Sequence, residues 1–233
     1  MLLSFFFISQ YQIQLMIFML PAILLGLWAQ ARVRSSYAAA QRQPSKMSGA
    51  AIARKVLDSS GLTNIPIEEV GGRLSDHYDP RQKVVRLSSE VFHGRNLAAT
   101  GIAAHEVGHA IQDARNYAPL VIRNLAAPAA GFGSSAGMIL AMLGLFLNFQ
   151  PLLFVGIVVF SLVVIFQVVN LPVEFNASSR AKNELLGLGL IDPQSMPVIN
   201  RVLSAAALTY VAATLQSVLT LLYFVLRFSG RRS

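Results

Sequence analysis

The chain of 233 residues contains no cysteine. This absence excludes disulfide bonds and thiolate metal sites, so a bound metal ion must take its ligands from histidine, aspartate, glutamate or water. A glycine-rich phosphate loop and a serine or cysteine nucleophile motif are also absent. The net charge is +8, but no basic run is interleaved with aromatic residues, so nucleic acid is not an expected partner.

Charged residues are missing from three long stretches, residues 1–31, 124–173 and 202–226. A membrane-spanning helix needs about 20 apolar residues, and the middle stretch can hold two such helices with a turn at residues 148–151. A cleaved secretory signal is the alternative for the first stretch, but the positive charge that normally begins a signal is lacking. The pattern predicts an integral protein of the lipid bilayer, with spans near residues 11–30, 130–148, 152–170 and 206–227.

Lysine and arginine lie mostly in residues 32–123 and 171–205. Four spans place both segments on one side of the bilayer, and the excess of positive charge predicts that this side is the cytoplasm. Arg227, Arg231 and Arg232 oppose this orientation, because the same four spans leave the C-terminus outside. We therefore expect a multi-pass protein whose polar segments face the cytoplasm.

The alternation of apolar and polar stretches predicts five parts. They are an N-terminal transmembrane helix (1–31), a soluble segment (32–123), a transmembrane hairpin (124–173), a helix with a connecting segment (174–205) and a C-terminal transmembrane helix with a tail (206–233). The soluble segment holds all 4 histidines of the chain. Any chemistry that needs histidine is therefore expected there.

The soluble segment shows both helical and extended patterns. A helix should begin at Ser48 and end near Gly61, strands should cover residues 65–70 and 83–87, and a second helix should cover residues 97–113. Residues 83–87 are a candidate edge strand to which an extended peptide could add. An ordinary structural strand is the alternative.

Residues 105–109 read His-Glu-Val-Gly-His, an H-E-x-x-H motif. On a helix His105 and His109 lie on one face, where both rings can bind one metal ion. Glu106 lies beside the first ligand and can take a proton from a metal-bound water, the arrangement of zinc peptidases. The small Gly108 could let a neighbouring segment approach the metal. A solvated helix that carries two histidines by chance is the alternative.

Catalytic zinc usually takes three protein ligands and leaves one position for water. Glu174 is the first charged residue after the uncharged hairpin, which should return to the same membrane side as the H-E-x-x-H helix. A carboxylate at the membrane boundary needs a partner, and a metal ion would be one. Glu174 is therefore the candidate third ligand. The alternatives are an ion pair of Glu174 with Arg180 or Lys182, and ligation by Glu184, His77 or His93.

Four segments together carry a family resemblance. They are Ser-Asp-His-Tyr-Asp-Pro-Arg at 75–81, Val-Val-Arg-Leu-Ser at 84–88, Ala-His-Glu-Val-Gly-His-Ala-Ile-Gln-Asp-Ala at 104–114 and Val-Glu-Phe-Asn-Ala-Ser at 173–178. In these segments the chain resembles the neutral zinc metallopeptidases of bacterial membranes, the YugP type. The resemblance extends from about residue 17 onward. The resemblance implies one zinc ion, several membrane spans, a gluzincin-type catalytic fold and a location in the bacterial plasma membrane.

The layout is also similar to that of the HtpX-type membrane proteases, which place a hairpin between H-E-x-x-H and the third-ligand glutamate. In those proteins an aspartate four residues after the glutamate orients a ligand histidine. Here that position is Ser178, which can form a hydrogen bond but brings no charge. Further candidates to support the ligands are Asp76, Asp79 and Asp113.

These observations predict a mainly α integral membrane protein with about four transmembrane helices and a small α+β zincin-like domain. The expected function is a zinc endopeptidase that cleaves peptide or membrane-protein substrates, with Glu106 as general base and His105, His109 and Glu174 as ligands. Candidate contacts to the substrate or transition state are His77, Tyr78 and Arg180. A catalytically silent zinc-binding scaffold is the alternative. A transporter is disfavoured because the spans lack ionisable residues. The sequence leaves the oligomeric state open.

Overall fold

The computed structural model describes residues 10–230, so the parts of the predictions that fall on residues 1–9 and 231–233 lie outside it. The described chain divides into two compact units. The site unit comprises residues Ala29–Ile122 and Asn170–Leu208, and the apolar unit comprises residues 10–28, Arg123–Val169 and 209–230.

Four helices within residues 10–230 are long and apolar enough to cross a membrane, which confirms the predicted number of spans. They are α1 (Gln10–Gln41), α5 (Ala118–Phe146), α6 (Gln150–Gly187) and α7 (Met196–Ser229). The helices are longer than the predicted spans, because an uncharged run marks only the apolar part of a helix. Polar residues at the helix ends continue the same backbone hydrogen bonding.

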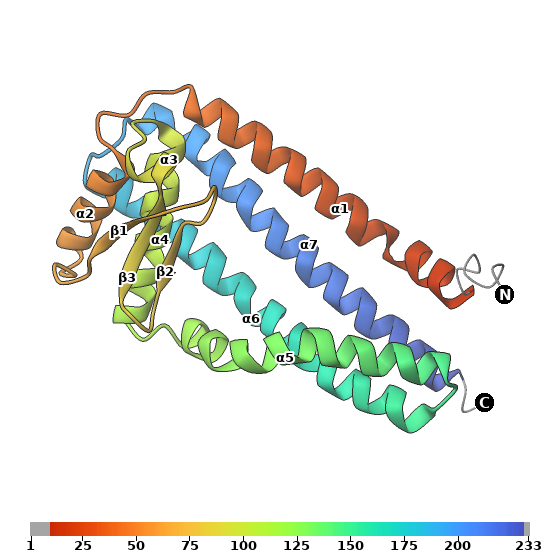
Figure 1. The fold of residues 1–233 in the computed structure, drawn as a ribbon. Helices are drawn as coiled ribbons and strands as arrows, with labels where there is room; N and C mark the ends of the chain where they lie inside the picture. The colour runs from red at the N-terminus through yellow and green to blue at the C-terminus, as the bar shows by residue number, and fades with distance from the viewer. Residues whose placement is uncertain (1–9, 231–233) are drawn as a thin grey trace. The chain divides into compact units, whose positions relative to one another are not determined.

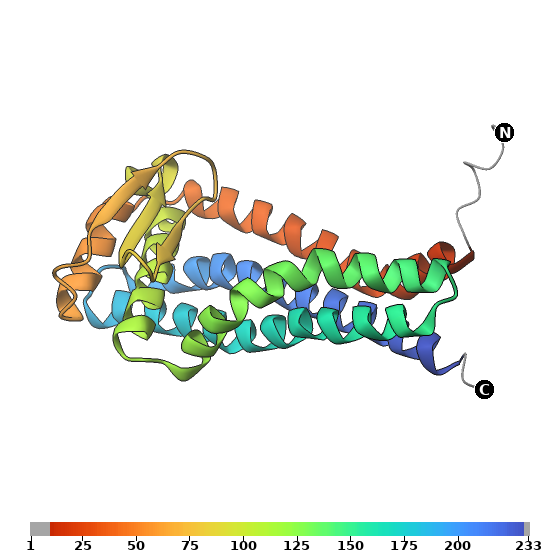
Figure 2. The same ribbon diagram turned by 60° about the horizontal axis from the view of Figure 1, so that its bottom comes forward.

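In the apolar unit α5 and α6 form the predicted hairpin, and both views show them side by side (Figures 1 and 2). The turn between them contains Asn148 with φ of 53°, a left-handed conformation that asparagine tolerates better than most residues. A Cβ at Gly144 would clash with the backbone of Leu153, so the glycine allows the two helices to approach closely. Phe132 and Phe146 are more than two-thirds exposed, as expected of side chains that face lipid.

The site unit contains a sheet of three strands, β1 (Ile67–Val70), β2 (His77–Asp79) and β3 (Val84–Ser88), in the order β1-β3-β2. Strand β1 is parallel to β3, and β2 is antiparallel to β3. Helices α2 (Gly49–Ser59) and α4 (Leu97–Ala114) pack with the sheet around one apolar core (Figure 1). The unit also contains two short helices, α3 (Ser89–Phe92) and the 3-10 turn η1 (Pro193–Ser195), and the adjoining parts of α1, α5, α6 and α7.

The predicted helix ends and strands of this unit are confirmed in their main features. Ser48 caps α2 by accepting a hydrogen bond from the backbone of Ala51, and Gly61 follows the helix with φ of 76°. Asn96 caps α4, the helix that carries the H-E-x-x-H motif, in the same way. Strand β1 is shorter than predicted, and β2 was not predicted.

The prediction that residues 83–87 form an edge strand is wrong, because β3 is the central strand of the sheet. Four of its five residues are buried, and only Arg86 is partly exposed. A nearly continuous apolar run is the pattern of a strand covered on both faces, whereas an edge strand usually carries charge or alternates. The edge strand that contacts α4 is β2.

Candidate metal centre

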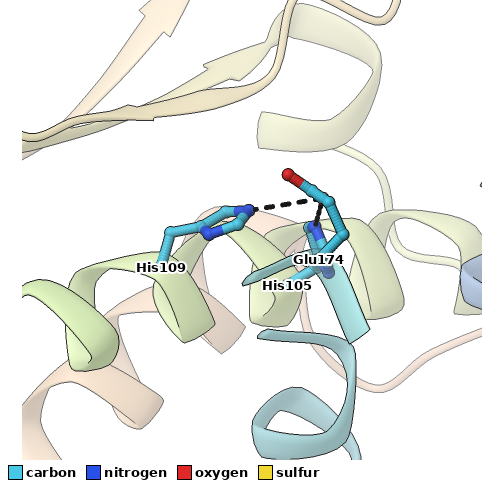
Figure 3. A group of neighbouring side chains, drawn as sticks. All are labelled: His105, His109 and Glu174. Atoms are coloured by element: carbon cyan, nitrogen blue, oxygen red, sulfur yellow. Dashed lines mark ion pairs between the residues drawn. The ribbon is translucent and has the colours of Figure 1, made fainter. Parts of the chain in front are cut away.

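Helix α4 places His105 and His109 one above the other on the same face, as the spacing predicts. Their ring centroids lie 4.8 Å apart, and the ring planes are nearly perpendicular at 85°. Helix α6 brings the Glu174 side chain against both rings (Figure 3). Residues separated by a whole hairpin in the sequence thus meet within the site unit.

The Glu174 carboxylate converges with both imidazoles. Its Oε2 lies 3.3 Å from His105 Nε2 and 3.7 Å from His109 Nε2, and the three candidate ligand atoms lie within 4.8 Å of one another. Glu174 is only 3% exposed, yet Oε2 forms no hydrogen bond with the described residues. A buried oxygen without a hydrogen-bond donor is costly, and a cation held among the three atoms would satisfy it. Two imidazoles and one carboxylate form a donor set that fits zinc.

Glu106 is almost fully buried beside these ligands and is not one of the three converging groups. The pKa of its carboxyl is raised to about 7, chiefly by burial and also by the Glu174 and Asp76 carboxylates, while His105 and His77 act in the opposite direction. A carboxyl with a pKa near neutrality can both accept and return a proton, which a general base requires.

Each candidate ligand histidine has a polar partner on its second ring nitrogen. The Ser178 hydroxyl lies 3.1 Å from His105 Nδ1, as its position four residues after Glu174 leads one to expect. Gln112 Oε1 lies 3.0 Å from His109 Nδ1, and this partner was not predicted. The three aspartates proposed for this role contact different residues: Asp76 accepts from Ser88, Asp79 from Arg86 and Asp113 from Tyr78.

The residues predicted to contact the substrate lie in different settings. The Tyr78 hydroxyl is 2.8 Å from Asp113 Oδ2, and burial together with this hydrogen bond raises its pKa. Arg180 donates from Nε to Asn176 and lies over the Tyr117 ring, with Cζ 5.9 Å from the centroid. His77 is exposed on β2, and its Nδ1 lies 2.7 Å from the Ser75 carbonyl oxygen.

His93 and Glu184, also considered as third ligands, lie outside the group of converging side chains. His93 is exposed and pairs with Glu69 at 3.0 Å. Glu184 lies further along α6 and is not among the converging groups of the described chain.

Comparison with known proteins agrees with this geometry. Residues 15–229 match the model of a family described as "Putative neutral zinc metallopeptidase". The chain belongs to this family. It is 45% identical over 215 residues to a protein of Bacillus subtilis (strain 168) named "Putative membrane protease YugP", and the match covers 91% of this chain and 96% of that protein. No solved structure matches the chain.

Family membership confirms the resemblance that the four sequence segments carry. Together with the four apolar helices, it identifies the chain as a membrane protein of a zinc metallopeptidase family. The chain's mainly helical architecture with a small mixed sheet agrees with the coarse fold prediction.

Proposed function

We propose that the chain is a membrane-bound zinc endopeptidase of the gluzincin kind, with its catalytic face in the cytoplasm. One observation carries the proposal: Glu174 Oε2 is buried against the two histidines of an H-E-x-x-H helix, and no residue between 10 and 230 forms a hydrogen bond with it. The nearly buried Glu106 carboxyl beside it is the group that a hydrolase needs and a purely structural metal site does not.

His105, His109 and Glu174 would hold one zinc ion through Nε2, Nε2 and a carboxylate oxygen. When bound, zinc would supply a Lewis acid that lowers the pKa of water and polarises a peptide carbonyl. Glu106 would take the proton from the attacking water on its carboxylate and return it to the departing amine nitrogen. In the metal-free chain, burial is the main reason that the pKa of this carboxyl is raised to about 7.

His77 is the strongest of the three candidates for contacting the substrate. Its Nδ1 faces the Ser75 carbonyl oxygen, which makes Nδ1 the N–H donor and leaves Nε2 to accept from, or when protonated donate to, a substrate. Its charge is among those that lower the pKa of the Glu106 carboxyl, which is the proposed base. In contrast, Tyr78 and Arg180 already donate to Asp113 and Asn176.

The substrate would be a peptide segment in extended conformation. Strand β2 carries His77, contacts α4 and lies at an edge of the sheet, where a peptide backbone can pair with it. This assigns to β2 the role that the sequence pattern gave to residues 83–87.

The decisive experiment measures zinc content and cleavage of casein or a quenched peptide by the full chain purified in detergent. Stoichiometric zinc with cleavage that a chelator abolishes would support the proposal. Stoichiometric zinc without cleavage by the wild-type chain would favour a catalytically silent zinc-binding scaffold. Absence of zinc from a well-folded chain would overturn both interpretations.

A further inference from the structure

A continuous chain of hydrogen bonds connects His109 with α6. Gln112 Oε1 lies 3.0 Å from His109 Nδ1, and Gln112 Nε2 lies 2.8 Å from the Val173 carbonyl oxygen and 3.0 Å from Asn176 Oδ1. Asn176 Oδ1 also lies 2.7 Å from Arg180 Nε. Gln112 is completely buried, so water does not compete for its amide.

The two ends of this chain determine the direction of every hydrogen bond within it. An arginine N–H can only donate, so the Asn176 atom that faces Arg180 must be the amide oxygen. A backbone carbonyl can only accept, so the Gln112 atom that faces Val173 must be the amide nitrogen. These two assignments agree with each other, because the same Gln112 nitrogen then donates to the Asn176 oxygen.

The tautomer of His109 follows from this direction. With its nitrogen toward α6, Gln112 presents its oxygen to His109, so Nδ1 must carry the hydrogen. The lone pair of the neutral ring then lies on Nε2, the nitrogen that faces Glu174. His105 differs, because the Ser178 hydroxyl near its Nδ1 can donate or accept and does not by itself select a tautomer.

We propose that Gln112 is a positioning residue that holds His109 in the Nδ1–H tautomer, and that Asn176 and Arg180 orient Gln112. The proposal rests on the proposed zinc site, because its benefit is an Nε2 lone pair ready for the metal. It also gives Arg180 a role different from a substrate contact. Gln112 places a neutral amide behind His109, where many metal sites have a carboxylate. The amide therefore orients the imidazole ring without adding negative charge to the site.

The first test determines the tautomer in metal-free protein, where zinc cannot impose it. The full chain is labelled with 15N-histidine, and the ring nitrogen shifts and couplings of its 4 histidines are assigned with single His variants. His109 should show the Nδ1–H pattern in wild type and lose it in Gln112→Leu. An Nε2–H pattern in wild type, or an unchanged Nδ1–H pattern in the variant, would overturn the proposal.

The second test measures zinc affinity by competition with a chelating dye. Gln112→Leu should weaken zinc binding by about 10- to 100-fold, as loss of a partner behind a ligand histidine usually does. Gln194→Leu is the matched control, because Gln194 is an exposed glutamine of η1 in the same unit. Wild-type affinity in Gln112→Leu would contradict the proposal.

A pair of variants at Asn176 covers the case in which Gln112→Leu does not fold. Asn176→Asp keeps an oxygen that accepts from both Gln112 and Arg180, so the tautomer and the zinc affinity should be retained. Asn176→Leu removes that acceptor and should weaken both. Equal behaviour of the two variants would contradict the proposed orientation. Failure of wild type to bind zinc would overturn the proposed function, whereas the metal-free tautomer would still decide the role of Gln112.

Discussion

A Cβ atom at Gly108 would stand 2.6 Å from the carbonyl oxygen of Ala177. The backbones of α4 and α6 are therefore in contact one residue before His109 and three residues after Glu174. This confirms the expectation that a small residue at position 108 lets a neighbouring segment approach the site. The spacing of the two helices sets the distance between the histidines and the carboxylate.

Gly108→Ala should therefore separate the two helices. Helix propensity alone would stabilise the variant by up to about 1 kcal/mol, whereas a clash with backbone costs about 1–3 kcal/mol. We expect net destabilisation and reduced zinc content, measured by thermal unfolding in detergent and by elemental analysis. Gly187→Ala is the control, because nothing lies within 4 Å of a Cβ at that position of α6. A stabilised Gly108→Ala variant with full zinc would show that the close contact does not constrain the site.

Glu106→Gln should bind zinc like wild type and lose nearly all cleavage. The amide is similar in size to the carboxylate but cannot take a proton from water, and Glu106 does not converge with the three ligand atoms. The loss should appear in kcat, because the proton transfer belongs to the chemical step. Zinc content and peptide cleavage are measured on the same preparation, and cleavage at the wild-type rate would exclude Glu106 as the base.

The pKa of Glu106 predicts a pH-dependent stability difference in the metal-free protein. The carboxyl pKa is about 7 in the folded chain and near the ordinary value of about 4.3 when unfolded. The folded state thus binds the proton more tightly, and stability falls as pH rises between these values because an ionised carboxylate remains buried. Glu106→Gln removes this charge, so at pH 8 its free energy of unfolding should exceed that of wild type by on the order of 3 kcal/mol. At pH 4 the carboxyl is largely protonated in both states, so the variant should have no such advantage.

Wild type and Glu106→Gln are freed of metal with a chelator, and their thermal unfolding is compared at pH 4 and pH 8. Glu184→Gln is the control for a carboxylate outside the site. A Glu106→Gln effect that is equal at both pH values would show that Glu106 does not titrate in this range.

The features predicted correctly from the sequence depend on local patterns. The long uncharged runs, the cap at Ser48, the turn at Asn148 and the four-residue spacing of His105 and His109 each report on a single element or turn. The encounter of Glu174 with these histidines was inferred from one tertiary argument, the return of a hairpin to the same side. The site unit does bring residues 29–122 and 170–208 together.

The features that were not predicted depend on tertiary contacts, which a local sequence pattern does not reveal. Strand β2 has only three residues, all of them titratable, and it is a strand because β3 pairs with it. Because β2 pairs with β3, β3 lies in the centre of the sheet. The prediction that residues 83–87 form an edge strand was wrong for this reason. Gln112 offered a signal, since it lies three residues after His109 and therefore on the same helix face. Its second set of partners lies on α6, which the spacing does not reveal.

The proposed orientation in the membrane predicts the behaviour of a topology reporter. The site unit combines both lysine- and arginine-rich segments, so we propose that they lie on one side of the bilayer, which is the cytoplasmic side that positive charge favours. A reporter that is active only outside the cell, inserted after residue 45, should be inactive, and one inserted in the turn at Asn148 should be active. Activity at residue 45 and inactivity at Asn148 would place the metal site outside the cell.

The last prediction is that Glu174 completes the zinc site. Its Oε2 is buried against both histidines, whereas Glu184 lies on the same helix outside the converging group. Glu174→Ala removes one of three ligands, so it should purify with much less zinc and show no cleavage, while the matched Glu184→Ala should retain both. His77→Ala and His93→Ala should also keep their zinc, because neither ring belongs to the group. If Glu174→Ala binds zinc like wild type while one of these three variants loses it, the ligand assignment is wrong. The buried oxygen of Glu174 would then need another partner, and the gluzincin interpretation would fail with it.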